Sequence, residues 1–143
     1  MGLFDFFSGK PQVSEQQLMQ KCMQAVGYYQ KRDFATAAKY FSEYFDLKGF
    51  GRFPRLDADD YRMYLNLMLS QFYSRNYSEC IKTCQKILKL NANSKDAYAF
   101  IAMSQFKLGY TSEANVNWNR ARELGNDLAI IFSSVSDVKM EGF

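Results

Sequence analysis

Two consecutive stretches of the chain repeat one another: Tyr61–Ser94 reads YRMYLNLMLSQFYSRNYSECIKTCQKILKLNANS, and Lys95–Leu128 reads KDAYAFIAMSQFKLGYTSEANVNWNRARELGNDL. Residue 95 follows residue 61 by 34 positions, and the two stretches align without a gap. Matched pairs include Tyr64 with Tyr98, Leu67 with Ile101, Met68 with Ala102, Ser70-Gln71-Phe72 with Ser104-Gln105-Phe106, and Leu90 with Leu124. A fixed period of this length predicts stacked helical hairpins, each burying its apolar face against the next.

A third copy lies upstream of these two. Aligning Ala37 with the small residues Cys80 and Ala114 starts this copy at Leu18 and makes Phe41 equivalent to Trp118. The predicted repeats therefore span about 18–51, 61–94 and 95–128, with an insertion at about 52–60. We expect one helical domain over 14–139, preceded by a tail and linker at 1–13.

These positions resemble the tetratricopeptide repeat. That family carries an aromatic residue at repeat position 4, Leu at 7, a small residue at 8, Gly near 15, Ala at 20, an aromatic residue at 24 and Ala at 27. The last repeat follows this pattern with Tyr98, Ile101, Ala102, Gly109, Ala114, Trp118 and Ala121, whereas the preceding repeat departs from it at Met68, Arg75, Cys84 and Ile87. The resemblance implies an all-α solenoid of three hairpins plus a C-terminal capping helix.

Capping residues and helix breakers divide the chain into seven predicted helices. They span about 14–31, 34–47, 58–74, 77–91, 95–108, 112–124 and 128–139. The start signals are Ser14 with Gln17, Asp33, Asp57, Asn76 with Glu79, Ser94, and Asn126-Asp127. The last helix is predicted from a stripe formed by Leu128, Ile131, Val135 and Val138.

Composition excludes several classes of function. The chain has 143 residues, a net charge of +3, three cysteines and no histidine. Histidine-based catalysis and metal sites are therefore excluded, and we find no catalytic constellation, phosphate loop or cofactor motif. The scattered Lys and Arg residues argue against nucleic-acid binding. We expect Cys80 and Cys84 to be buried apolar groups. We also expect the protein to be cytoplasmic and not an enzyme.

The resemblance also implies a concave groove lined by the first helix of each repeat. The candidate groove residues are Met23, Val26, Tyr29, Arg62, Leu65, Asn66, Leu69, Tyr73, Phe100, Met103 and Lys107. Most of the side chains at groove positions are apolar, which predicts a protein-interaction module for a partner with an apolar peptide segment. The alternative is that they form an ordinary core between helices.

Two kinds of repeat protein provide a test of this prediction. Members that bind acidic C-terminal tails use a two-carboxylate clamp, but its positions here hold Cys22, Val26, Asn66, Asp96 and Phe100, of which only Asn66 matches. Three repeats in a short chain also resemble the secretion chaperones that cradle translocator segments. An adaptor or chaperone-like role is therefore the favoured prediction.

The tail residues Leu3, Phe4, Phe6 and Phe7 are apolar and should dock on something. Docking into the protein's own groove would inhibit binding, and docking into a neighbouring copy would form a homodimer or scaffold. Attachment to a membrane surface is less favoured because no basic face adjoins the phenylalanines.

Overall fold

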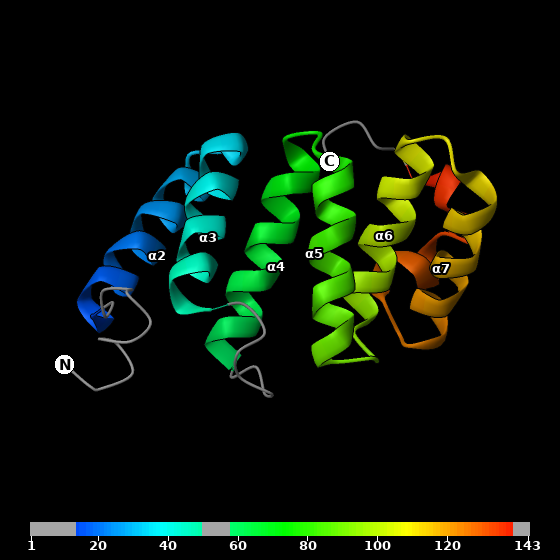
Figure 1. Ribbon diagram of the computed structural model, residues 1–143. Helices are drawn as coiled ribbons and strands as arrows, with labels where there is room; N and C mark the ends of the chain where they lie inside the picture. Colours follow the sequence, from blue (N-terminus) through cyan, green and yellow to red (C-terminus); the bar gives the residue numbers. More distant parts are fainter. Residues whose placement is uncertain (1–13, 50–57, 139–143) are drawn as a thin grey trace.

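A computed structural model of the chain describes residues 14–49 and 58–138. These ranges contain helices and no strands, as predicted (Figure 1). The α-helices are α2 Glu15–Gln30, α3 Phe34–Lys48, α4 Ala58–Tyr73, α5 Tyr77–Leu90, α6 Lys95–Lys107, α7 Thr111–Glu123 and α8 Asp127–Ile131, and a short 3-10 helix, η1, covers Val135–Asp137. None of these helices combines the length and hydropathy needed to cross a membrane.

The helices form three hairpins, α2–α3, α4–α5 and α6–α7, arranged in a row (Figure 1). The second helix of each hairpin packs against the first helix of the next, and α4 also contacts α2 and α6. Between α3 and α4, the rings of Phe45 and Tyr64 stack with centroids 3.8 Å apart. The hairpins thus share one continuous core, as a solenoid requires.

Local signals in the sequence set the helix ends. Ser14 and Gln17 form a reciprocal capping box at the start of α2. Asp33, Ser94 and Asn126 each accept a hydrogen bond from a backbone N–H in the first turn of their own helix. Because these bonds satisfy N–H groups that have no partner within the helix, they fix where the helix begins.

The turn inside each hairpin has the same geometry. Its central residue is Arg32, Arg75 or Gly109, and each has a positive φ, of 61°, 64° and 91° respectively. The next backbone N–H in each turn bonds to a carbonyl five residues earlier, at 2.8–2.9 Å. This is the helix-ending motif that usually carries glycine, and two of the three turns build it with arginine.

The junction between α3 and α4 carries a polar cluster that the sequence did not predict. Asp60 is only 7% exposed, pairs with Lys48 and accepts a hydrogen bond from the Tyr44 hydroxyl at 3.3 Å. This contact connects the two helices on either side of residues 50–57.

The predicted C-terminal helix at 128–139 is wrong beyond Ile131. The Phe132 carbonyl accepts hydrogen bonds from Trp118 Nε1 at 2.8 Å and from an Arg122 guanidinium nitrogen at 3.2 Å. Phe132 itself is extended, with φ −106° and ψ 118°. Side chains of α7 thus bind the backbone where the helix would have continued. Beyond this point, the Val135 side chain is fully buried.

Candidate functional site

Among the first helices of the three hairpins, α4 contacts both α2 and α6. Residues at equivalent turns of these helices therefore form one surface, which we call the first-helix face. On α2, Met23 and its neighbour Met19 are 68% and 64% exposed, while Val26 and Tyr29 are half-buried. The α2 part of this face therefore carries exposed apolar side chains.

The α4 part of the face is also accessible. Arg62 is exposed, and Leu65, Asn66, Leu69 and Tyr73 are half-buried. Ser70 donates its hydroxyl to the Asn66 backbone carbonyl at 2.7 Å, so the Asn66 carboxamide is not used in that bond. The exposed large apolar side chains of this face, Met19 and Met23, thus lie on α2, and α4 adds half-buried ones.

The α6 part of the prediction needs correction. Phe100 is 8% exposed and Met103 is fully buried, whereas Lys107 is exposed. The Phe100 ring meets the Phe72 ring edge-on at 5.4 Å, and η1 also contacts α6. Neither Phe100 nor Met103 is accessible to a bound segment, because the neighbouring elements cover both.

An aromatic cluster lies at the turn end of this face. The Phe34 ring centroid is 5.5 Å from that of Tyr29 and 4.8 Å from that of Tyr73, and the Arg32 guanidinium lies 5.4 Å above the Phe34 ring. Burial raises the pKa of both tyrosines, while the Arg32 charge acts to lower them. At neutral pH both tyrosines are therefore protonated hydroxyls, which can donate hydrogen bonds to a peptide backbone.

The cysteines are placed as small apolar groups. Cys80 and Cys84 are fully buried, and burial raises the pKa of the Cys84 thiol well above its usual range. Cys22 is half-buried, with its sulfur 3.2 Å from the sulfur of Met63. Within the described ranges, no three His, Cys, Asp or Glu side chains are grouped as a metal site would require.

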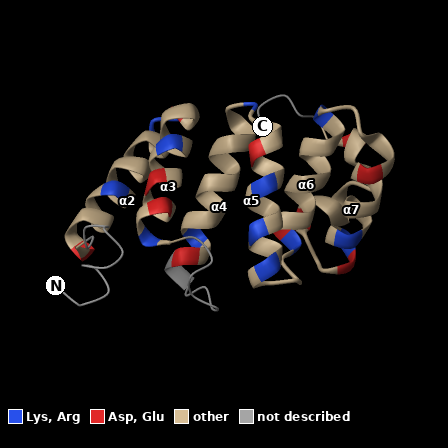
Figure 2. Cartoon of the chain, viewed as in Figure 1, with Lys and Arg blue, Asp and Glu red and all other residues tan. Residues whose placement is uncertain are grey.

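Charged residues are interspersed along the row of helices. In the view of Figure 2, Lys and Arg occur on several helices from α2 to α7, with Asp and Glu among them. Asp96, at a clamp position, accepts a hydrogen bond from the Asn126 carboxamide at 3.1 Å. The first-helix face is therefore characterised by apolar contact rather than by one sign of charge.

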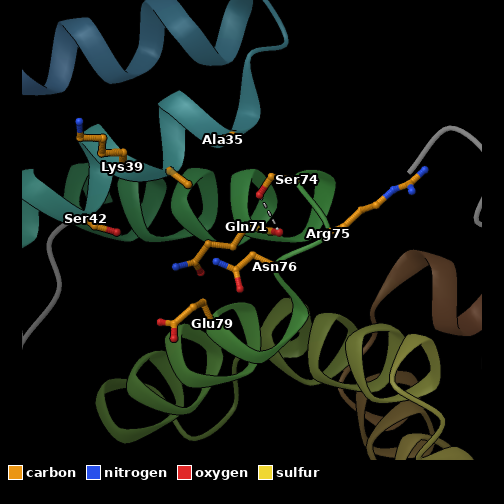
Figure 3. Close-up of a pocket in the computed structure, with 9 residues that line it drawn as sticks. Ala35, Lys39, Ser42, Gln71, Ser74, Arg75, Asn76 and Glu79 are labelled. Carbon is orange, nitrogen blue, oxygen red and sulfur yellow. Dashed lines mark hydrogen bonds between the residues drawn. The ribbon is translucent and has the colours of Figure 1, made fainter.

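The structure also contains a hollow that sequence reasoning missed. It has a volume of about 560 Å³ and lies between α3, the end of α4 and the start of α5 (Figure 3). Its lining residues are Ala35, Ala38, Lys39, Ser42, Gln71, Ser74, Arg75, Asn76 and Glu79. None of the eleven predicted groove residues belongs to this set. The lining is mostly polar and spread over three elements, so no local sequence pattern identifies it.

Several predictions fall outside the described residues. The tail residues Leu3, Phe4, Phe6 and Phe7 lie there, as does most of the predicted insertion at 52–60. Docking of the tail, a dimer formed through it and its attachment to a membrane all stay predictions.

No protein-family model matches the sequence, and no curated protein matches it. Solved structures do match the fold. The type III secretion chaperone SycD of Yersinia enterocolitica, in complex with a peptide of the translocator YopD, has a TM-score of 0.64 at 20% identity and covers 82% of each chain. PcrH from Pseudomonas aeruginosa has a TM-score of 0.62 at 21% identity and covers 80% of each chain.

The first TPR of Spaghetti (RPAP3), bound to the HSP90 peptide SRMEEVD, has a TM-score of 0.65 at 18% identity and covers 84% of this chain and 90% of that chain. At these identities the likeness concerns the fold, which agrees with the 34-residue period, the hairpin row and the repeated turns. The chain is an all-α solenoid with the tetratricopeptide-repeat fold.

Proposed function

We propose that this protein is a non-enzymatic adaptor or chaperone that holds an apolar segment of a partner protein on its first-helix face. The observation that carries the proposal is the exposure of Met19 and Met23 on α2, a helix that contacts α4, where Leu65 and Leu69 are half-buried. Exposed apolar side chains grouped on one surface mark contact sites. Methionine is flexible and polarizable, so it can adapt to segments of different shape.

Contact with these side chains contributes favourably to the free energy of binding. Burying one large apolar side chain stabilises by about 1.5–3 kcal/mol, so two methionines and two leucines supply several kcal/mol before ordering costs. The polar groups beside them, Asn66 and the hydroxyls of Tyr29 and Tyr73, are suited to hydrogen bonds with the backbone of the segment. Apolar contacts would then give affinity and polar contacts would orient the chain.

Proteins of the same fold support this proposal. PcrH has been crystallised with the chaperone binding region of PopB, and SycD with a peptide of YopD. Binding of an acidic peptide, such as the HSP90 peptide SRMEEVD of the RPAP3 complex, is less suited to this chain because Asp96 and the buried Phe100 occupy clamp positions. An internal apolar segment is the better match for the exposed methionines.

The proposal is tested with two substitutions on the face and one control. Met23→Asp and Leu69→Asp place a charge where the segment would pack, whereas Val116→Asp changes a residue on α7 that is 70% exposed, close to the 68% of Met23. Peptides are selected from an array of apolar sequences, and their affinities are measured by fluorescence anisotropy.

We expect Met23→Asp and Leu69→Asp each to weaken binding by about tenfold or more, because a lost apolar contact is worth about 1.5–3 kcal/mol. Val116→Asp should bind like the unmodified protein. Circular dichroism checks that all three variants keep their helix content. Equal affinity in all four proteins would refute the assignment of this face.

A further inference from the structure

The hollow between α3 and α5 has the properties of a second binding site. Its volume of about 560 Å³ lies within the range of ligand sites in proteins. On the α3 side, Ala35 and Ala38 have small side chains that leave the space open. On the other side, the end of α4 and the first turn of α5 present polar groups (Figure 3).

Gln71 provides an oriented donor in this hollow. The residue is only 6% exposed, and its Oε1 accepts a hydrogen bond from the Thr83 hydroxyl at 2.6 Å. That bond fixes the carboxamide, so the NH₂ group is held among the lining residues (Figure 3). The NH₂ group is thereby available to a ligand that brings an acceptor.

Asn76 adds a second unused carboxamide. It occupies the N-cap of the 14-residue helix α5 but makes no capping bond with its side chain, unlike Asp33 at the start of α3. The first-turn N–H groups of α5 therefore lack this capping acceptor, at the end of the helix where acceptors and negative charge are favoured. Asn76 lies close to Gln71 in the middle of the hollow (Figure 3).

Charge is arranged along the length of the hollow. Lys39 and Arg75 stand at opposite ends of the lining residues, and Glu79 lies on the α5 side (Figure 3). A carboxamide can both donate to and accept from a peptide backbone, and a cation at each end favours acidic side chains.

We propose that this hollow binds an extended acidic segment of a partner protein. A backbone carbonyl of the segment bonds to the Gln71 NH₂ group, the Asn76 carboxamide pairs with the neighbouring peptide unit, and two acidic side chains reach Lys39 and Arg75. This site lies outside the first-helix face and does not depend on the function proposed for that face.

The test uses the full-length protein and a defined probe, acetyl-Glu-Gly-Glu-Gly-Glu-amide, with the corresponding Gln peptide as the uncharged control. Binding is followed by ¹H–¹⁵N NMR, in which the side-chain NH₂ signals of Gln71 and Asn76 report directly on the hollow. We expect the Glu peptide to shift these signals and the backbone signals around Lys39 and Glu79, and the Gln peptide to bind more weakly.

A matched pair of variants separates a site from general attraction to charge. Arg75→Gly and Arg32→Gly each remove one arginine from an equivalent hairpin turn, where the positive φ suits glycine. Only Arg75 lines the hollow. Arg75→Gly should lower the affinity for the Glu peptide by about fivefold, the upper range for the loss of an exposed ion pair, and Arg32→Gly should leave this affinity unchanged.

Three results would overturn the proposal. The first is the absence of any shift of the Gln71 and Asn76 signals. The second is an equal effect of Arg32→Gly and Arg75→Gly. The third is a set of shifts confined to α2 and the exposed side of α4, which would place the acidic peptide on the first-helix face instead.

Discussion

The hairpin turns lead to a prediction about stability that uses three equivalent positions. Arg32, Arg75 and Gly109 all have positive φ, a conformation that costs a residue with a side chain about 1–2 kcal/mol. Glycine avoids this cost but loses about 0.5–1 kcal/mol more in chain entropy on folding. The net gain expected for Arg75→Gly is therefore about 0.5–1 kcal/mol.

The other two positions should respond differently. The Arg32 guanidinium lies 5.4 Å above the Phe34 ring, and such a contact is worth about 0.5–1 kcal/mol at an exposed site. Its loss offsets the gain, so Arg32→Gly should be close to neutral. Gly109→Ala should destabilise by about 1 kcal/mol, entirely through the backbone, because a Cβ there meets nothing within 4 Å.

The assay is urea unfolding followed by far-UV circular dichroism. The three variants should share the unmodified protein's m value, so differences in the midpoint report differences in stability. The expected order of stability is Arg75→Gly, then Arg32→Gly together with the unmodified protein, then Gly109→Ala. A destabilised Arg75→Gly combined with a stabilised Gly109→Ala would refute the reasoning from φ.

Three further predictions concern single side chains. Trp118→Phe removes a hydrogen bond to the Phe132 carbonyl and part of a fully buried ring. It should lower the free energy of unfolding measured in urea by about 1–3 kcal/mol and increase hydrogen exchange in η1. Unchanged exchange in η1 would contradict this role of Trp118. Burial raises the pKa of Tyr73 above its ordinary value of about 10, so above this pH the folded state binds more protons than the unfolded state and stability is lost as the pH rises. A tyrosinate absorbance titration of Tyr73→Phe should lack one late-titrating group. A thiol reagent should modify the half-buried Cys22 in the native protein before the fully buried Cys84, whose pKa is raised by burial, and equal rates at the two cysteines would contradict this placement.

The helices could be predicted from the sequence because their signals are local. A capping side chain acts on an N–H group three residues away, as in the Asp33–Thr36 contact. The apolar pattern that predicts a helix repeats every three or four residues. The predicted helix 34–47 therefore agrees closely with the observed Phe34–Lys48, whereas the start of Tyr77–Leu90 was predicted correctly although its expected cap, Asn76, makes no side-chain capping bond.

The prediction of a C-terminal helix was wrong beyond Ile131 because side chains from another helix bind the backbone there. The stripe from Leu128 to Val138 is a valid helical pattern, but it takes no account of Trp118 and Arg122. These residues of α7 bind the carbonyls of Phe132 and its neighbours, which ends the helix after Ile131. A hydrogen bond across 14 residues lies outside the range of any local pattern.

By itself, the sequence determined the repeat, the hairpins and the apolar character of the first helices. Only the tertiary structure decided which of those apolar side chains remain accessible: Met23 is exposed, whereas Met103 is fully buried. It also decided that Gln71, Asn76 and Lys39 meet around one hollow. Exposure and juxtaposition depend on what packs against a residue from elsewhere in the chain, whereas helix formation depends mainly on its near neighbours.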